Sequence, residues 1–178
     1  METNWNIDAK HSEIGFKVRH MMISNVHGKF AAFKAIAKTH GEDFSSAKFD
    51  FSAAINSIDT GADDRDAHLK SDDFFNAEKY PDMVFKSIGI EKKDDHNFII
   101  NGELTIRDVT KPIALSAEFA GIVQDPYGQT KAGMTVNGKI KRSEYGLLWS
   151  AVTEAGKIVV SDDIQLNCER GVNESKRK

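Results

Sequence analysis

The chain has 178 residues, of which 40% are hydrophobic and 29% are charged, and its formal net charge at pH 7 is −3. These values are ordinary for a soluble globular protein, and the length suits a single domain. The small negative charge provides no overall basic field that would favour nucleic acid or an anionic membrane.

Alternation of apolar and polar residues with a period of two recurs along the chain and predicts β-strands. In chain order, and including two less regular runs at 28–38 and 83–91, about eight strands are expected over residues 12–18, 28–38, 48–55, 83–91, 98–107, 113–119, 131–140 and 163–169. Two short helices are expected around Arg19–Ser24 and over Asp63–Lys70. The second begins with Asp63 and Asp64, which suit a helix N-terminus.

The connections between these strands read as hairpins. Asp125, Pro126 and Gly128 occupy the first, second and fourth places of a type I turn, and 93–97 and 108–112 are short polar links. No long helical pattern separates the strands, which argues against a parallel α/β sheet. The sequence therefore predicts an all-β fold: an eight-stranded antiparallel barrel with one or two short helices.

A barrel of eight strands is either filled by its own side chains or leaves room for one small ligand. Small residues are interleaved with large apolar ones on the expected inner face, namely Ala53, Gly102, Ala117, Ala132 and Gly138. Two interpretations stay open. The small residues leave a cavity, or they relieve crowding where the barrel bends.

Polar and ionisable residues gather at the ends of the first long strand, around the predicted helix at 63–70, and at the strand ends that carry Arg107 and Arg142. His11, His20 and His68 with Asp64 are a conceivable zinc set, but no spacing forces these side chains to converge. No Gly-x-Ser-x-Gly or His-Glu-x-x-His motif occurs. We therefore expect no metal, no cofactor and no catalytic residue. Cys168 is the only cysteine, so no internal disulfide can form.

Several motifs, which are specific in combination, resemble the YceI-like family, and the match runs in order along essentially the whole chain. They are Trp5-x-Ile7-Asp8-x-x-His11-Ser12-x-Ile14-x-Phe16-x-Val18-x-His20-Met21, Val26-x-Gly28-x-Phe30, Thr60, Arg65-Asp66-x-His68-Leu69-x-Ser71-x-Asp73-Phe74-Phe75, Tyr80-Pro81-x-x-x-Phe85-x-Ser87, Gly102-x-Leu104-Thr105-Ile106-Arg107, Val109-Thr110-Lys111-Pro112 and Arg142-x-x-Tyr145-Gly146.

The resemblance implies an extended lipocalin-like barrel over residues 1–170 that binds an isoprenoid or other long-chain lipid in its channel, followed by a basic, disordered tail at 171–178. It also favours a homodimer. Two residues depart from the usual pattern: Asp108 stands in place of Gly and Tyr145 in place of Phe. The first residues, METNWNIDAK, lack the features of a signal peptide. We therefore expect a cytoplasmic protein, or a periplasmic one if a signal has been removed.

The implied function is to bind and to carry or sequester a polyprenyl diphosphate or an isoprenoid quinone, without catalysis. A ligand of roughly 40 heavy atoms at about 0.3 kcal/mol per atom would bind with nanomolar affinity. Fatty acid or fatty amide binding, and an enzyme acting on a lipid head group, stay as alternatives. The residues expected to contact the ligand are Phe16, Val18, His20, Met21, Met22, Phe30, Phe51, Ile55, Arg65, His68, Phe74, Phe85, Ile100, Leu104, Arg107, Leu115, Met134, Val136, Arg142 and Tyr145.

Overall fold

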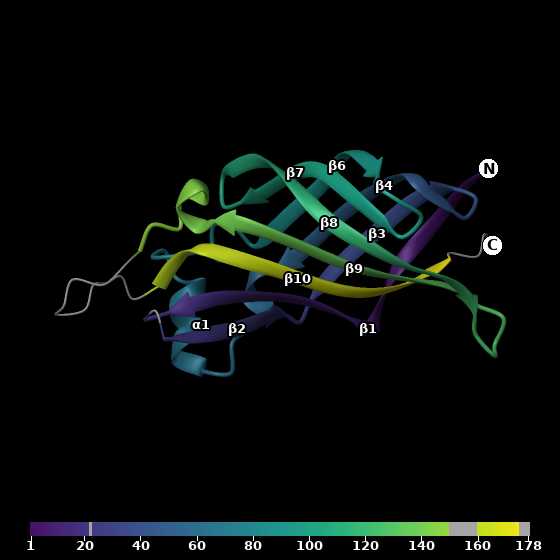
Figure 1. Ribbon diagram of the computed structural model, residues 1–178. Coiled ribbons are helices and arrows are strands. Elements are labelled where there is room, and N and C mark those ends of the chain that lie inside the picture. Colours follow the sequence, from purple (N-terminus) through teal and green to yellow (C-terminus); the bar gives the residue numbers. More distant parts are fainter. Residues whose placement is uncertain (22, 150–159, 175–178) are drawn as a thin grey trace.

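The computed structural model describes residues 1–21, 23–149 and 160–174, and these form one twisted barrel of antiparallel strands (Figure 1). The strands are β1 (Glu2–His20), β2 (Ser24–Phe30), β3 (Phe33–His40), β4 (Asp43–Ala54), β5 (Ile58–Asp59), β6 (Asp82–Lys92), β7 (Asn97–Ile106), β8 (Val109–Gln124), β9 (Thr130–Lys141) and β10 (Val160–Glu174). The helices are α1 (Asp63–Lys70) and two short 3₁₀ turns, η1 (Ile55–Ser57) and η2 (Arg142–Tyr145).

Eight of these strands form the closed barrel. Their order is β10-β9-β8-β7-β6-β4-β3-β1, and pairing of β1 with β10 completes the circle. Every neighbouring pair is antiparallel. The predicted eight-stranded antiparallel barrel is thereby confirmed. Closure leaves these strands with few free edges, which protects the backbone polar groups from pairing with other chains.

The long strand β1 has two successive partners on one of its edges. Glu2–Asn6 pair with β3, whereas Gly15–His20 pair with β2, and on the other edge β1 pairs with β10. The hairpin of β1 and β2 therefore extends away from β3 and β4. Helix α1 lies at the same end of the molecule as this hairpin (Figure 1).

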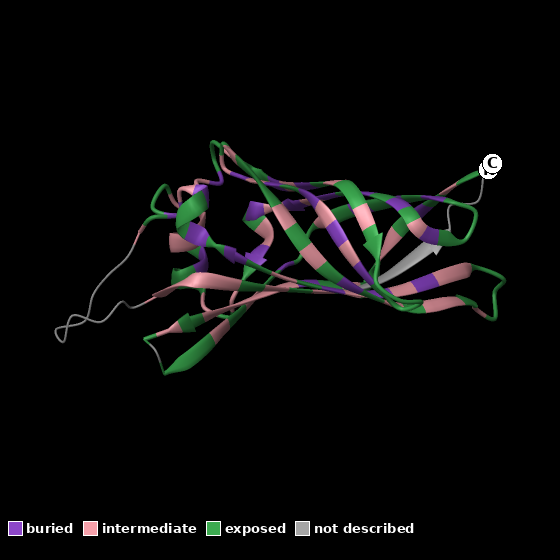
Figure 2. Ribbon diagram, turned by 45° about the horizontal axis from the view of Figure 1, so that its top comes forward, coloured by how far each residue is buried: buried purple, intermediate pink, exposed green. Residues whose placement is uncertain are grey.

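Side chains fill the interior at the opposite end of the barrel. Trp5 is fully buried, and its Nε1 donates to Thr39 Oγ1 at 2.8 Å. Its ring lies 5.1 Å from that of Phe44, which in turn lies 4.9 Å from Phe119. Along the strands, exposed and buried residues alternate as expected (Figure 2). The space inside the barrel is therefore left mainly toward the α1 end.

Helix α1 is confirmed with the predicted bounds, and Asp63 and Asp64 lie in its first turn. The helix predicted around Arg19–Ser24 is wrong. This segment ends β1 and begins β2, with Arg19 opposite Asn25, and Met21 adopts a positive φ of 52° in the connecting turn. The β pattern of Phe16 and Val18 simply continues to the hairpin.

The link predicted at 108–112 is also wrong. Strand β8 begins at Val109, and Thr105 pairs with Thr110, so only Arg107 and Asp108 form the turn. Arg107, rather than Asp108, takes the left-handed conformation, with φ at 55°. The Asp125–Gly128 turn forms as predicted, because Gly128 N donates to Asp125 O at 3.0 Å.

The glycines of the inner face relieve crowding. A Cβ at Gly102 would lie 2.4 Å from a ring atom of Phe85, and one at Gly138 would lie 2.4 Å from Leu115. Large neighbouring side chains therefore occupy the space over these glycines, which supports the second of the two interpretations, relief of crowding, at these two positions. Separately, β10 continues to Glu174, so it includes the first four residues of the predicted tail; 175–178 lie outside the described residues.

Candidate ligand-binding cavity

A cavity of about 410 Å³ lies inside the barrel at the α1 end and is called the outer cavity here. This volume falls within the range of roughly 300–1,000 Å³ that is typical of small-molecule sites. Its walls are Phe16, Val18, His20, Val26, Phe30, Thr60, Asp64, Arg65, His68, Leu69, Phe74, Phe75, Met83, Ile106, Ile140, Arg142, Leu147, Trp149, Val160, Ile164 and Leu166.

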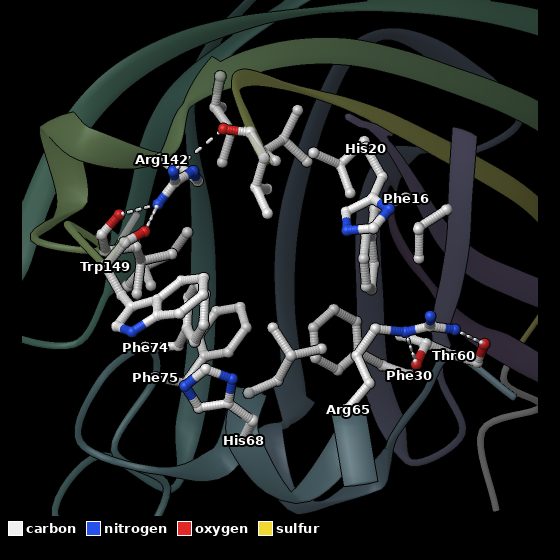
Figure 3. A pocket seen from close by; sticks show the side chains of 18 of the residues that line it. Phe16, His20, Phe30, Thr60, Arg65, His68, Phe74, Phe75, Arg142 and Trp149 are labelled. Atoms are coloured by element: carbon white, nitrogen blue, oxygen red, sulfur yellow. Dashed lines mark hydrogen bonds between the residues drawn. The ribbon is translucent and has the colours of Figure 1, made fainter. Parts of the chain in front are cut away.

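The outer cavity is lined mostly by apolar side chains, and its few polar groups come from a small number of segments. In Figure 3, Arg142 and Trp149 lie across the opening from His20 and Phe16, and Arg65 and His68 project from α1. A mostly apolar wall with a few polar groups is the usual arrangement of a site for an apolar or amphiphilic ligand.

Arg142 is 6% exposed and acts as a clamp on the backbone around the cavity. Its Nη1 donates to the carbonyl oxygens of Leu147 and Trp149, both at 2.7 Å. Its Nε donates to Ser161 O at 3.0 Å, and Nη2 donates to Val160 O at 3.3 Å. Burial lowers the pKa of Arg142, and nearby Asp162 partly offsets this effect.

These bonds determine what Arg142 can contribute to ligand binding. A guanidinium binds a phosphate or carboxylate bidentately through two parallel N–H groups. Four of the five N–H groups of Arg142 are already donated to backbone carbonyls. Arg142 therefore lines the cavity but holds the wall in place, and it cannot also grip an anionic head group as a fork.

Arg65, in the first turns of α1, binds the residue Thr60 that precedes this helix. Its Nε donates to Thr60 Oγ1 at 2.8 Å, and its Nη2 donates to Thr60 O at 2.7 Å. Thr60 donates in turn to the buried Asp66, from its N at 2.9 Å and from its Oγ1 at 2.5 Å. The Nη1 hydrogens of Arg65 are donated in none of these bonds, so this exposed guanidinium retains donors at the cavity mouth.

His68 stands between aromatic rings and a carboxylate. Its ring meets those of Phe74 and Trp149 edge-on, at centroid distances of 5.1 and 4.8 Å. Its Nε2 donates to Asp73 Oδ2 at 2.8 Å. The aspartate therefore fixes the orientation of a half-buried imidazole against the apolar wall.

The histidines considered for zinc do not gather. His11 bonds with Asp8 at 2.7 Å, and it is absent from the cavity wall that holds His20 and His68. Across the described residues, no group of three or more His, Cys, Asp or Glu side chains is placed to hold a metal ion. Likewise, no helix in the described ranges is long and apolar enough to span a membrane.

Most of the residues predicted to contact the ligand line one of the spaces inside the barrel. Eight line the outer cavity: Phe16, Val18, His20, Phe30, Arg65, His68, Phe74 and Arg142. Six more, together with Phe16 and Phe30, line a second space of about 60 Å³, the inner cavity: Phe51, Phe85, Ile100, Leu104, Leu115 and Val136. Met134 borders a void of about 10 Å³ beyond it.

The remaining predicted residues lie elsewhere. Met21 is 44% exposed in the turn between β1 and β2 and is absent from the cavity wall. Ile55 and Tyr145 belong to the packed core. Met22 lies outside the described residues.

Arg107 braces the cavity wall from behind. Its Nη1 donates to Phe74 O at 3.0 Å and to Gly146 O at 3.4 Å, and its guanidinium lies over the ring of Tyr80. It thereby ties the loop that carries Phe74 to the turn that leads to Trp149. Its contribution to the cavity is to position these two aromatic residues.

The sequence interpretation missed Leu69 and Trp149, among other wall residues. Leu69 follows Arg65 by four residues and therefore shares its face of α1, so helical spacing identifies it. Trp149 follows η2 in a segment without regular secondary structure. No periodic pattern in the sequence therefore indicates that the side chain of Trp149 points into the barrel.

Tyr145 carries a buried hydroxyl without a hydrogen-bond partner among the described residues, and the residue is only 1% exposed. Such a group costs about 1–3 kcal/mol. We expect Tyr145→Phe to raise the free energy of unfolding by about 1 kcal/mol at neutral pH. Chemical denaturation of both proteins measures the difference.

Burial, with a smaller contribution from Glu144, raises the pKa of Tyr145 to about 12. The folded protein therefore holds this proton more tightly than the unfolded chain, whose tyrosine titrates near 10. Titration of Tyr145 therefore leaves the free energy of unfolding unchanged below about pH 10. As the pH rises from about 10 toward about 12, the free energy of unfolding falls, because the unfolded chain loses this proton first. The wild type should lose more stability than Tyr145→Phe between pH 9 and 11.5, and equal losses would contradict the assignment.

Comparisons with known proteins agree with this fold. The model of the YceI-like domain matches residues 5–170. A UPF0312 protein of Photorhabdus laumondii is 36% identical over 147 residues, covering 82% of this chain and 76% of its own. A UPF0312 protein of Staphylococcus epidermidis is 34% identical over 164 residues, covering 92% and 93%.

Solved structures give the same result. The YceI protein of Campylobacter jejuni superposes with a TM-score of 0.77 at 38% identity, covering 95% of this chain and 96% of that one. A polyisoprenoid binding domain from Saccharophagus degradans superposes with a TM-score of 0.68 at 16% identity, covering 96% and 98%; at that identity the likeness concerns the fold.

Proposed function

This chain belongs to the YceI-like family, and on that basis we propose that it binds an isoprenoid lipid in the outer cavity and carries or sequesters it. The observation that carries the proposal is an apolar cavity of about 410 Å³ inside a barrel whose opposite end is packed with aromatic side chains. The fold shared with a polyisoprenoid binding domain from Saccharophagus degradans supports the same ligand class.

The apolar walls supply most of the affinity in this proposal. Burying apolar surface stabilises the complex by about 25 cal/mol per Å². Arg142 adds little to this, because four of its N–H groups already donate to backbone carbonyl oxygens. The head group would lie at the mouth, near Arg65, His20 and His68, in contact with water. A quinone, an alcohol or a diphosphate can occupy such a mouth, and the hydrocarbon chain defines the ligand class.

The proposal is tested on the purified protein by denaturing extraction and mass spectrometry, followed by titration with prenyl alcohols and with a fatty acid. We expect a co-purified prenyl lipid, or saturable binding of the added alcohols that is tighter than binding of the fatty acid. Preference for the fatty acid would replace the isoprenoid by the alternative ligand class. A protein that is free of lipid and binds none of these compounds would refute the proposal.

The non-catalytic role, the homodimer and the cytoplasmic location belong to the same proposal. His68 bonds with Asp73 and Arg65 bonds with Thr60 at the cavity mouth. Light scattering of the pure protein measures the oligomeric state. Recovery of unmodified prenyl alcohol after prolonged incubation with the protein tests the absence of turnover.

A further inference from the structure

Three exposed apolar side chains lie next to the wall of the outer cavity. Ile23 is 83% exposed, Leu148 is 68% exposed and Met21 is 44% exposed. Met21 directly follows the wall residue His20, and Leu148 directly precedes the wall residue Trp149. The backbone N of Ile23 donates to His20 O at 3.2 Å. We call Met21, Ile23 and Leu148 the rim.

The rim lies on two sides of the cavity opening. His20 and Trp149 face each other across this opening (Figure 3). Met21 and Ile23 belong to the turn between β1 and β2, whereas Leu148 belongs to the segment between η2 and β10. Single exposed apolar side chains are ordinary on a protein surface. Several of them around one opening mark a surface that contacts a protein or a membrane.

The β1–β2 hairpin carries its part of the rim away from the rest of the barrel. One edge of β2 pairs with β1 over residues 24–29, and the other edge pairs with β5 at Lys29 and Phe30. In the described part of the chain, residues 24–28 have no strand on this second edge. Their backbone groups there need water, so the hairpin tip can enter the head-group region of a bilayer but not its hydrocarbon core.

The proposed ligand indicates which partner the rim contacts. An isoprenoid lipid is almost insoluble in water because its hydrocarbon chain is apolar, so it resides in a bilayer. Apolar side chains around the opening can be buried at the boundary between head groups and acyl chains while the opening faces the membrane. The exposed charges in the first turn of α1 are of both signs, Arg65 against Asp63 and Asp64, so an anionic lipid should bring little gain.

We propose that the rim docks on the surface of a zwitterionic lipid bilayer, and that the ligand passes directly between this bilayer and the outer cavity. This inference rests on the proposed lipid binding and adds the route of exchange. Transfer during contact proceeds at a rate proportional to the concentration of membrane. A ligand that first escapes into water would instead leave the protein at a rate independent of the membrane.

The test follows transfer from the protein to vesicles. The purified protein is loaded with deuterated geranylgeraniol and mixed with phosphatidylcholine vesicles, which are removed by centrifugation at successive times. Mass spectrometry measures the alcohol that stays with the protein. We expect the initial rate for the wild type to rise in proportion to the vesicle concentration. Ile23→Ser combined with Leu148→Ser should lower this rate by about tenfold, and Ile23→Ser alone by about threefold.

Two controls separate docking from binding. The rim variants should load the alcohol as well as the wild type does, because their substituted side chains lie outside the cavity wall. Tyr127→Ser removes a side chain that is 89% exposed in the β8–β9 turn, at the opposite end of the molecule (Figure 1). This variant should transfer its ligand at the wild-type rate.

The outcomes distinguish this inference from the proposed function. A loaded wild type whose transfer rate is independent of vesicle concentration would overturn docking and leave lipid binding intact. A folded double variant that transfers at the wild-type rate would overturn the role of the rim. A dimer that dissociates in the double variant, measured by light scattering, would assign the rim to a contact between two copies and overturn the membrane contact. A wild type that cannot be loaded would overturn the proposed function.

Discussion

Arg142→Ala is expected to lower the free energy of unfolding by about 3–5 kcal/mol, as does the removal of one partner from other buried charged networks. The guanidinium donates to four backbone carbonyl oxygens, from Leu147, Trp149, Val160 and Ser161. Alanine cannot satisfy any of them. Because these carbonyls belong to segments that line the cavity, the variant should also bind prenyl alcohols more weakly. Urea denaturation and the alcohol titration measure the two effects.

Two control variants accompany this experiment. Arg142→Lys keeps the charge but replaces the planar fork by a single ammonium group, so it should restore only part of the stability. Lys141→Met removes the neighbouring exposed cation, which pairs with Asp163 at 3.2 Å. We expect its denaturation midpoint to stay close to that of the wild type. A fully stable Arg142→Ala would show that the clamp is dispensable.

Val18→Trp is expected to block the outer cavity and to weaken prenyl alcohol binding by about 30-fold. Val18 lines the wall on β1, and tryptophan in its place would add about seven side-chain heavy atoms to the outer cavity. About seven ligand atoms would lose their place, each worth about 0.3 kcal/mol. The fold should persist, because the new side chain enters space that is not packed.

Val123→Trp is the matched control. Val123 is 64% exposed near the end of β8, so the same substitution adds an indole group without touching the cavity. It should bind like the wild type, and both variants should show the circular dichroism of the wild type. Wild-type affinity in a folded Val18→Trp would place the ligand outside the outer cavity.

The sequence predicts the barrel well because its signal is periodic and local. The runs at 98–107 and 131–140 coincide with strands β7 and β9, except that Arg107 lies in the turn after β7. The two aspartates at the start of α1 mark its first turn. The sequence gives a wrong helix at Arg19–Ser24 because a short run rich in methionine shows no clear period. In the structure, its place is fixed by cross-strand pairing with β2, which is a non-local contact.

The cavity was harder to predict than the strands. Alternation indicates which side chains point inward, but it gives no information on how deep the space between them extends. Leu104 and Phe85 point inward as expected, yet they border only the small inner cavity. The position of the Phe16 ring in the cavity wall depends on its contact with Gly28, which follows from the register of two strands rather than from the spacing of residues in the chain.

The closure of the barrel by β1 and β10 has a consequence for biosynthesis. Trp5 pairs with Glu174 and His20 pairs with Val160. The first strand therefore completes its hydrogen bonding only when β10 is present. During translation one edge of β1 can pair with β2 and β3 early, but its other edge stays open until β10 has left the ribosome. Such distant pairings slow folding, and open edges invite association with other chains. Newly made copies are therefore most vulnerable to aggregation, and most dependent on chaperones, just before the final strand is released.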